Sequence, residues 1–365
     1  MAGRIVIFGA TGYTGRHTAE RLVESGVRPV LAARNVERVR ALGDELGGLE
    51  VAVADVGRPE SVRDLVGAGD VLVATVGPFT RWGDPAVEAA IAAGAHYLDS
   101  TGESAFIRRV FEHFGPRAEA AGIGMVTAFG FDWVPGNIAG ALALREAGEG
   151  ARRVRIGYFS PGEIKGSGGT MATIATSTFE SGFAWRDGRL VTERMAKRYS
   201  TFEVNGRERP AISVGSSEHF ALPRLQPGLR EVDSYLGWFG PASRPMQAMS
   251  AVAAAATAIP GMRSGLQSLA GRFVKGSTGG PDAEVRAKSG SYAVATAYDD
   301  SGRELAEVRV EGGNAYDFTF GILAWGARTA AAGGLTGSGA LGPADGFGVD
   351  ELEAGCREAG LTRVG

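Results

Sequence analysis

Short apolar runs alternate with Ala-, Glu- and Arg-rich windows through roughly the first 130 residues, and this alternation limits the possible folds more than any other feature. Strands that alternate with crossover helices form a parallel sheet. The sequence therefore predicts an α/β fold with a doubly wound parallel sheet of the Rossmann type. The six strand-like runs are 4–8, 29–33, 49–54, 71–76, 96–100 and 124–128.

The pattern changes after Gly130. Segments 153–159, 283–298 and 303–310 are typical of strands, and Asp-Asp-Ser-Gly at 299–302 predicts a hairpin turn between the last two. Strands joined by a hairpin turn indicate a second α+β domain with a mixed or antiparallel sheet. We predict a Rossmann domain at 1–133, an α+β domain at 134–332, and a tail at 333–365 that packs back on the Rossmann domain.

Charge and residue counts exclude several kinds of partner. The 38 basic residues nearly balance the 41 acidic ones, and no block of like charge is long enough to serve as a nucleic-acid arm. The single Cys356 cannot form an intrachain disulfide, which fits a reducing compartment. The four histidines stand far apart, so we expect no metal site.

Targeting and membrane signals are weak. A strand pattern starts by Arg4, which leaves no room for a signal peptide. The most membrane-like stretch, 246–262, is mostly alanine and shorter than the ~20 strongly apolar residues that a spanning helix needs. We predict a cytoplasmic protein without a transmembrane segment, in which 246–262 is a buried or partner-facing helix or makes peripheral contact with a membrane.

A glycine-rich turn joins the first predicted strand to the first predicted helix. Strand, glycine turn and helix in this order place backbone N–H groups and the positive end of a helix dipole against a pyrophosphate. At the first strand of a βαβ series, this motif predicts a dinucleotide site; the alternative is a tight turn without a ligand. Its residues are Gly9, Ala10, Thr11, Gly12, Tyr13, Thr14 and Gly15.

The end of the second predicted strand distinguishes the two nicotinamide cofactors. An acidic residue there would bind the free ribose 2′-OH of NAD, whereas this chain has Arg34 and Asn35. A guanidinium pairs with a 2′-phosphate and stacks on adenine, so we predict NADP(H). The alternative is that Arg34 is a solvated loop residue. Asp55, after the third strand, is placed to meet the adenine edge or is an exposed turn residue.

Five motifs carry a resemblance to a known family. They are Gly-Ala-Thr-Gly-Tyr-Thr-Gly-Arg at 9–16, Ala-Ala-Arg-Asn at 32–35, Thr-Val-Gly-Pro-Phe at 75–79, Tyr-Leu-Asp-Ser-Thr-Gly-Glu at 97–103 and Gly-Phe-Asp-Trp-Val-Pro-Gly at 130–136. In their order and spacing the chain resembles the saccharopine dehydrogenase-like oxidoreductases, which include the bacterial trans-acting enoyl reductases of lipid and polyketide assembly. The resemblance implies a cofactor domain followed by a substrate domain whose sheet often mediates dimerisation, hence a homodimer.

Two features depart from the family pattern. Trp133 stands where relatives commonly have a small polar residue, and 333–348 is unusually rich in glycine. Short-chain dehydrogenases share the glycine turn, but their Tyr-x-x-x-Lys relay is absent, because no tyrosine here is followed four residues later by lysine.

Ligands of a doubly wound sheet bind beyond the carboxyl ends of its strands. We assign the turn Val76, Gly77, Pro78 and Phe79 to contact with the nicotinamide ribose; the alternative is a plain turn. Reduction of a double bond needs a proton donor besides the hydride. The candidates at the strand ends are Tyr97, Asp99, Glu103 and Asp132. Each also has a structural interpretation: Tyr97 as a core aromatic, Asp99 as a loop anchor, Glu103 as a capping partner and Asp132 as a helix N-cap. Solvent is a fifth possible donor.

The sequence favours an NADPH-dependent oxidoreductase that reduces a conjugated C=C bond of a hydrophobic acyl or polyketide-derived substrate, either a small molecule or tethered to a carrier. One alternative is a saccharopine-type imine reductase, whose carboxylate-rich substrate demands clustered arginines. The candidates for that cluster are Arg186, Arg189, Arg194 and Arg198. A second alternative is a non-catalytic NADP-sensing or lipid-associated binding protein.

Overall fold

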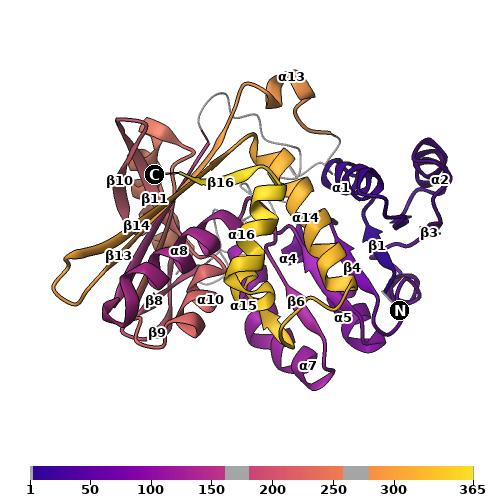
Figure 1. Ribbon diagram of the computed structural model, residues 1–365, viewed down its shortest axis with the longest axis horizontal. Coiled ribbons are helices and arrows are strands. Elements are labelled where there is room, and N and C mark those ends of the chain that lie inside the picture. The colour runs from indigo at the N-terminus through magenta and orange to yellow at the C-terminus, as the bar shows by residue number, and fades with distance from the viewer. Residues whose placement is uncertain (1–2, 161–180, 258–278, 365) are drawn as a thin grey trace. The chain divides into compact units, whose positions relative to one another are not determined.

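The computed structural model describes residues 3–160, 181–257 and 279–364. Contacts divide the chain into two units, whose elements are labelled in Figure 1. Unit 1 comprises Met1–Val134, Ser277–Gly280 and Tyr316–Gly360, and unit 2 comprises Pro135–Gly276, Pro281–Ala315 and Leu361–Gly365. Residues 258–262 of the alanine-rich stretch lie outside the described residues. Within the described ranges, no helix has both the length and the apolar character required to cross a bilayer.

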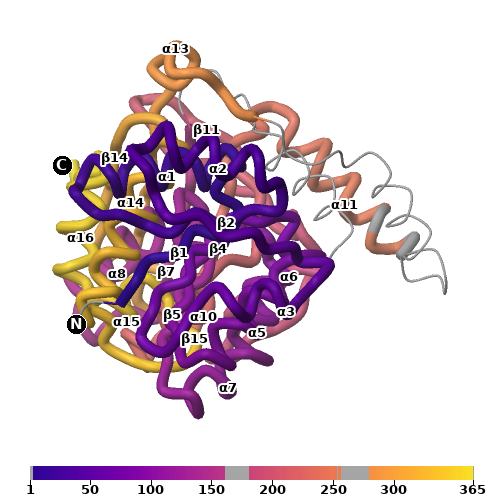
Figure 2. Tube along the Cα trace, turned by 90° about the vertical axis from the view of Figure 1, so that its right-hand side faces the viewer, coloured from indigo at the N-terminus to yellow at the C-terminus, as the bar shows by residue number. Residues whose placement is uncertain are grey.

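Unit 1 is built on a seven-stranded sheet whose described pairings are all parallel. Its strand order is β15-β6-β5-β4-β1-β2-β3, with β1 between β4 and β2 (Figure 2). All residues of β1 and β4 are buried, as expected for central strands of a parallel sheet. The strands are β1 (Ile5–Phe8), β2 (Val30–Ala33), β3 (Val51–Val53), β4 (Val71–Ala74), β5 (His96–Asp99), β6 (Gly124–Val126) and β15 (Gly339–Leu341).

Helices cover both faces of this sheet. Figure 2 shows α1 (Tyr13–Glu24) and α2 (Val36–Glu45) on one side of the strands, and α3 (Pro59–Arg63) and α5 (Asp84–Ala93) on the other. The doubly wound Rossmann prediction is therefore confirmed. The remaining helical segments are α4 (Phe79–Trp82), α6 (Ser104–Arg109), η1 (Val110–Phe114), α7 (Gly115–Ala120), α14 (Ala315–Ala331), α15 (Pro343–Phe347) and α16 (Val349–Glu358).

Unit 2 contains a nine-stranded mixed sheet. Its main path runs β10-β11-β12-β7-β13-β14-β16, with β8 and β9 attached at β12. The β12–β7 pair is parallel and its neighbours are antiparallel, which confirms the predicted second sheet. The strands are β7 (Arg153–Phe159), β8 (Ser181–Arg186), β9 (Arg189–Arg194), β10 (Tyr199–Val204), β11 (Arg207–Val214), β12 (Glu231–Leu236), β13 (Ser291–Tyr298), β14 (Glu304–Gly312) and β16 (Leu361–Val364).

The helical segments of unit 2 pack around this sheet. A strand was expected from residue 283, but the chain forms a short helix there, capped by Asp282, whose carboxylate accepts a hydrogen bond from the Val285 N–H at 2.9 Å. The strand β13 starts only at Ser291. The helices are α8 (Val134–Ala147), η2 (Gly148–Gly150), α10 (Glu218–Leu225), η3 (Gly240–Ala242), α11 (Ser243–Thr257) and α13 (Ala283–Arg286).

The grouping of the C-terminal third differs from the expected division at 332. Nearly all of α14 groups with unit 1, because Gly326 fits against Phe129 and the Trp325 ring stacks on Phe129 with centroids 6.3 Å apart. Within the tail, β15 pairs with β6 of unit 1, whereas β16 pairs with β14 of unit 2. The tail is thus divided between the two units.

Candidate active site

The glycine turn between β1 and α1 forms a cradle for an anion. Gly9 has a φ of +94°, and a Cβ there would lie 2.6 Å from the Thr75 hydroxyl. At Gly15, a Cβ would strike the carbonyl of Gly9. Helix α1 has Gly12 as its N-cap with no side-chain cap and no acidic residue in its first turn, so its first N–H groups and dipole favour a phosphate. The arrangement fits a dinucleotide pyrophosphate.

The other residues of this turn have mixed surroundings. Ala10 is fully buried, and its N–H donates to the Ala32 carbonyl at 3.1 Å. Thr11 and Thr14 are partly exposed. The Tyr13 ring packs edge-on against Tyr316 and Phe320 of α14, with centroids 5.4 and 5.5 Å apart. Helix α14 therefore supports the first turn of α1, a role that sequence reasoning missed because only a long-range contact reveals it.

The segment after β2 presents an exposed cation. Arg34 is exposed and makes no hydrogen bond or ion pair within the described part of the chain. Asn35 has a structural use as the N-cap of α2, since its Oδ1 accepts a hydrogen bond from the Arg38 N–H at 2.8 Å. Arg16, in the first turns of α1, pairs with Glu20 at 2.9 Å and with Glu45. Arg34 is thus an exposed cation at the carboxyl end of β2.

Asp55 stabilises the turn after β3. Its Oδ1 accepts a hydrogen bond from the Gly57 N–H at 2.9 Å, and its own N–H donates to the Ser61 hydroxyl at 3.0 Å. This is an Asx turn, in which a carboxylate oxygen replaces a backbone carbonyl. Asp55 therefore holds the loop whether or not it also meets adenine.

Glu103 anchors the turn that follows β4. Its Oε1 accepts a hydrogen bond from the Phe79 N–H at 2.7 Å, and its Oε2 accepts from the N–H and hydroxyl of Thr80 at 2.9 and 2.6 Å. The side chain is only 1% exposed. Both oxygens thus hold the start of α4 and fix Val76–Phe79, of which Gly77 is the exposed point. The geometry favours the anchoring role of Glu103 over proton donation.

Asp99 and Tyr97 occupy the same buried face of β5. The Oδ1 of Asp99 accepts hydrogen bonds from the Thr101 and Ala128 N–H groups, both at 2.9 Å, and its Oδ2 accepts from the Thr127 hydroxyl at 2.8 Å. Burial, partly offset by these bonds, raises the pKa of Asp99 to about 6. Burial and then the neighbouring Asp99 charge raise the pKa of Tyr97 well above its usual range. Both side chains are fully enclosed and act as loop anchor and core aromatic.

Asp132 differs from the other candidate acids because its side chain makes no hydrogen bond that stabilises the described part of the fold. Its Oδ1 is buried and has no hydrogen-bond partner among the described residues, while the residue as a whole stays partly exposed. It accepts no hydrogen bond from the first turn of α8, so it is not that helix's N-cap. Burial raises its pKa to about 7. A Cβ at Gly102 would lie 2.9 Å from the Asp132 Oδ2, so glycine there lets the β5 and β6 loops meet.

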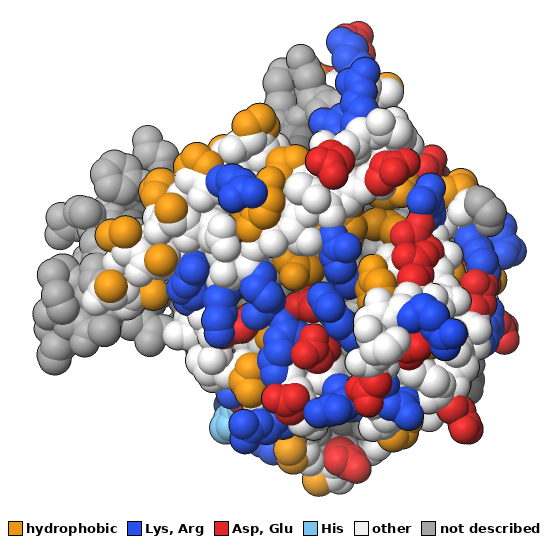
Figure 3. Space-filling model, turned by 90° about the vertical axis from the view of Figure 1, so that its left-hand side faces the viewer, with side chains coloured by type: hydrophobic (Ala, Val, Ile, Leu, Met, Phe, Trp, Pro, Cys, Tyr) orange, Lys and Arg blue, Asp and Glu red, His pale blue; other side chains and the backbone are white. Residues whose placement is uncertain are grey.

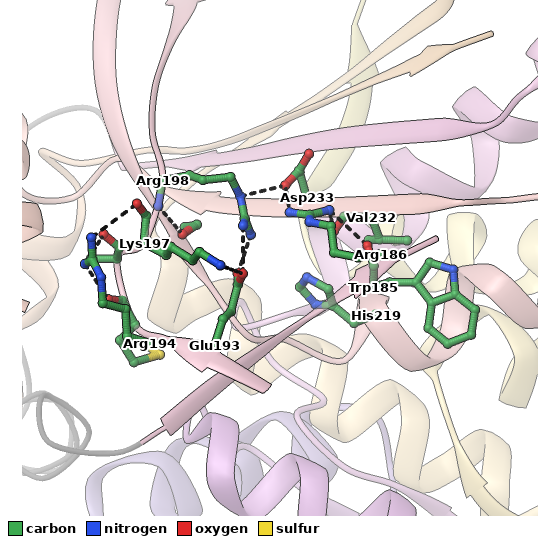
Figure 4. Close-up of polar contacts among 12 residues, drawn as sticks. Trp185, Arg186, Glu193, Arg194, Lys197, Arg198, His219, Val232 and Asp233 are labelled. Atoms are coloured by element: carbon green, nitrogen blue, oxygen red, sulfur yellow. Dashed lines mark hydrogen bonds and ion pairs between the residues drawn. The ribbon is translucent and has the colours of Figure 1, made fainter. Parts of the chain in front are cut away.

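The four arginines of the alternative substrate site lie in unit 2, and three of them have partners there (Figure 4). Arg186 and Arg198 both bind Asp233, and Arg198 also binds Glu193. Burial alone would raise the pKa of Asp233, but the charges of Arg186 and Arg198 outweigh it and lower that pKa. Arg194 donates to the carbonyls of Ala196 and Gln247 at 3.0 and 3.2 Å, and Arg189 is exposed.

Comparisons with known proteins concern the nucleotide-binding region and the fold. Residues 9–106 match a family model described as NAD(P)H-binding. A provisionally named trans-acting enoyl reductase of Mycobacterium tuberculosis (strain ATCC 25618 / H37Rv) is 37% identical over 180 residues, which are 47% of this chain and 43% of that protein. The trans-acting enoyl reductase of Mycobacterium ulcerans (strain Agy99) is 37% identical over 153 residues, 40% of this chain and 36% of that protein. The matched region thus spans less than half the length of these relatives.

The second unit also has a counterpart of known structure. Apo histidine-tagged saccharopine dehydrogenase (L-Glu forming) from Saccharomyces cerevisiae matches over 100% of both chains with a TM-score of 0.61 at 12% identity, which shows a shared fold. Together the comparisons show an NAD(P)H-binding region and a shared fold. The expected resemblance is therefore confirmed: the chain carries an NAD(P)H-binding domain, has the fold of saccharopine dehydrogenase, and is similar in sequence to mycobacterial trans-acting enoyl reductases.

Proposed function

We propose that this protein is an NADPH-dependent reductase of a conjugated C=C bond on a hydrophobic acyl or polyketide-derived substrate, small or carrier-tethered. The observation that carries the proposal is Asp132, an unbonded carboxyl with a pKa of about 7 in the loop after β6. This loop follows the carboxyl end of a strand in the sheet that holds the glycine cradle, the edge where such folds bind their ligands. The names of the similar mycobacterial proteins support the enoyl substrate.

The chemistry divides between the cofactor and the chain. When bound, the reduced nicotinamide supplies a hydride to the β-carbon of the conjugated double bond. Asp132 then donates its proton to the α-carbon, and the resulting carboxylate regains a proton from solvent at its exposed edge. A carboxyl with a pKa near neutrality suits this role, because general acids work best close to the operating pH. Glu103 contributes by holding the turn at 76–79 through the Phe79 and Thr80 N–H groups.

Arg34 supports NADPH rather than NADH as the donor. The end of β2 carries this exposed guanidinium where an acid would repel a 2′-phosphate. The imine-reductase alternative has less support, because Asp233 and Glu193 already neutralise Arg186 and Arg198. A homodimer and a cytoplasmic location stay predictions of the sequence.

The test is oxidation of NADPH, followed by the absorbance of the reduced nicotinamide. We expect substrate-dependent oxidation with medium- and long-chain 2-enoyl thioesters, and little with mixtures of 2-oxo acids and amino acids. Turnover with the second set only would support the imine reductase. Tight NADPH binding without turnover on either set would contradict the enzyme proposal and favour the binding-protein alternative.

A further inference from the structure

Helix α11 of unit 2 exposes two large apolar side chains. Met249 is 67% exposed and Val252 is 71% exposed, and among the described residues only Val53 joins them as a large exposed hydrophobic side chain. Spacings of three and four residues place the exposed positions on one helix face. That face consists of Ala248, Met249, Ala251, Val252 and Ala255.

On the opposite, less exposed side of α11, polar side chains next to Met246 and Ala254 hold the helix to the sheet. The amide of Gln247 donates to the Lys197 carbonyl at 3.1 Å, and the Gln247 carbonyl accepts from Arg194 at 3.2 Å. Arg194 also donates to the hydroxyl of Ser250. A surface helix ordinarily buries its apolar stripe and exposes its polar one. Helix α11 instead exposes Met249 and Val252, which indicates a face that meets an apolar partner.

The surroundings of α11 present positive charge. Lys197 is 54% exposed at its side chain, whereas the carboxylates of Glu193 and Asp233, which bind the neighbouring cations, are 5% and 2% exposed (Figure 4). Figure 3 shows hydrophobic side chains gathered along one edge of this side of the molecule, with Lys and Arg side chains close by. Lys197 thus reaches the surface, whereas the two carboxylates are buried.

The sequence extends this charge bias. From 234 to 281 the chain contains no Asp or Glu, although acids make up 41 of the 365 residues. The same stretch holds Arg244, Arg263, Arg272 and Lys275. Arg244, in the first turn of α11, is exposed and lies 4.2 Å from the Tyr199 ring centroid. An apolar helix face bordered by cations and free of acids is typical of a segment that lies in an anionic membrane interface.

We propose that α11 docks this protein on an anionic phospholipid surface. Met249 and Val252 enter the boundary of the acyl chains, and Arg244 and Lys197 face the lipid phosphates. From Ala248 to Ala255 the exposed row has small or flexible side chains and lacks the aromatic Trp and Tyr anchors that dominate many protein–protein contacts. A lipid surface needs no such anchors, because it adapts to the inserted side chains. This inference is independent of the proposed reaction, since α11 holds none of the candidate active-site residues.

Flotation of the full chain with lipid vesicles tests the proposal. We expect binding to vesicles of equal parts phosphatidylcholine and phosphatidylglycerol, weak binding to phosphatidylcholine alone, and loss of binding as salt rises. The double variant M249E/V252E should bind at least about tenfold more weakly, because two carboxylates then face the acidic surface. Val53→Glu is the matched control, since it adds one acid at an exposed hydrophobic position outside α11 and should bind like the parent. Thermal melting and NADPH binding should be unchanged in M249E/V252E.

Three outcomes would overturn the proposal. The first is no binding of the parent chain to the anionic vesicles. The second is equal binding of the parent chain and M249E/V252E, or equal binding to neutral and anionic vesicles. The third combines two results: the parent chain does not bind vesicles, and M249E/V252E changes the oligomeric state or the capture of a carrier protein. That combination would assign α11 to a protein contact.

Discussion

At the level of single residues, the four candidate acids differ in what their oxygens already do. Both carboxylate oxygens of Glu103 and of Asp99 accept hydrogen bonds from the chain, and the Tyr97 hydroxyl lies in the core. Asp132 alone combines a buried Oδ1 lacking a partner with partial exposure of the residue. A carboxyl that stabilises nothing around it is available for chemistry.

Asp132→Asn should reduce the rate of reduction by about 100-fold or more, because the amide cannot deliver a proton, while the NADPH affinity stays within about twofold. Stopped-flow measurement of hydride transfer and fluorescence titration of NADPH separate the two quantities. A variant with the parent's rate would show that solvent is the proton donor.

The pH dependence of the parent enzyme follows from the same residue. Donation requires protonated Asp132, so the rate of reduction should fall as the pH rises through about 7. Stability should change in the same direction: the folded state retains this proton above the ordinary carboxyl range, so the free energy of unfolding decreases between about pH 4 and 7. Asp99, with a pKa of about 6, adds to this decrease. Asp132→Asn should flatten both profiles, and an unchanged rate profile would contradict the assignment.

Arg34→Ala should weaken NADPH binding by about tenfold and leave NADH binding nearly unchanged, because the lost contact is with the 2′-phosphate. Isothermal titration with both nucleotides measures the difference. Arg40→Ala, an exposed arginine on the neighbouring α2, is the control. Equal losses for NADPH and NADH would assign Arg34 to another role.

At the level of elements, loops at the ends of β4, β5 and β6 are joined by single side chains. Glu103 holds the start of α4, and Gly102 lets the Asp132 carboxyl approach the loop after β5. The turn at 76–79 and the candidate acid are thus positioned by the same short segment, 101–103.

Glu103→Gln should lower the free energy of unfolding by about 1–3 kcal/mol and weaken cofactor binding. The amide nitrogen of Gln cannot accept a hydrogen bond, so either the Phe79 or the Thr80 N–H loses its acceptor. Chemical denaturation measures the first effect. Glu112→Gln removes only the exposed pair with Arg108 and should cost no more than about 0.5 kcal/mol. The pH profile of the rate should keep its midpoint in Glu103→Gln; a shifted midpoint would give Glu103 a role in proton transfer.

Gly102→Ala should leave the fold intact and slow reduction by at least about tenfold, since the new Cβ displaces the Asp132 carboxyl. Gly313→Ala is the matched control, because a Cβ there meets no atom within 4 Å. Steady-state rates and thermal melting of both variants give the comparison. An unaffected rate in Gly102→Ala would show that the position of Asp132 is not critical.

At the level of the whole molecule, local motifs predicted the cofactor half well. Strand, glycine turn and helix signals at 4–24 lie within a single stretch, so sequence spacing alone indicates their geometry. The contacts of Tyr13 with α14, and the pairing of β15 with β6, join residues about 300 and 200 positions apart. Such contacts leave no periodic signal in the sequence. The sequence therefore predicts neither the seventh strand nor the grouping of α14 with unit 1.

Truncation after residue 332 should prevent folding, because it removes β15 and exposes the β6 edge together with the apolar surface under α15 and α16. Truncation after Gly360 removes only the edge strand β16 and should lower the melting temperature while NADPH binding persists. Circular dichroism and nucleotide titration of the two truncated chains measure these effects. NADPH binding by the shorter chain would show that the seventh strand is dispensable.

The discontinuous make-up of unit 1 sets an order of events during synthesis. Its first six strands leave the ribosome long before β15, and unit 2 is made in between. The N–H and carbonyl groups at the β6 edge therefore stay unpaired until residue 341 has emerged from the ribosome. Domains generally fold as units during synthesis. Here the nucleotide-binding domain begins before unit 2 and is completed after it, so its seven-stranded sheet closes only once residue 341 is available.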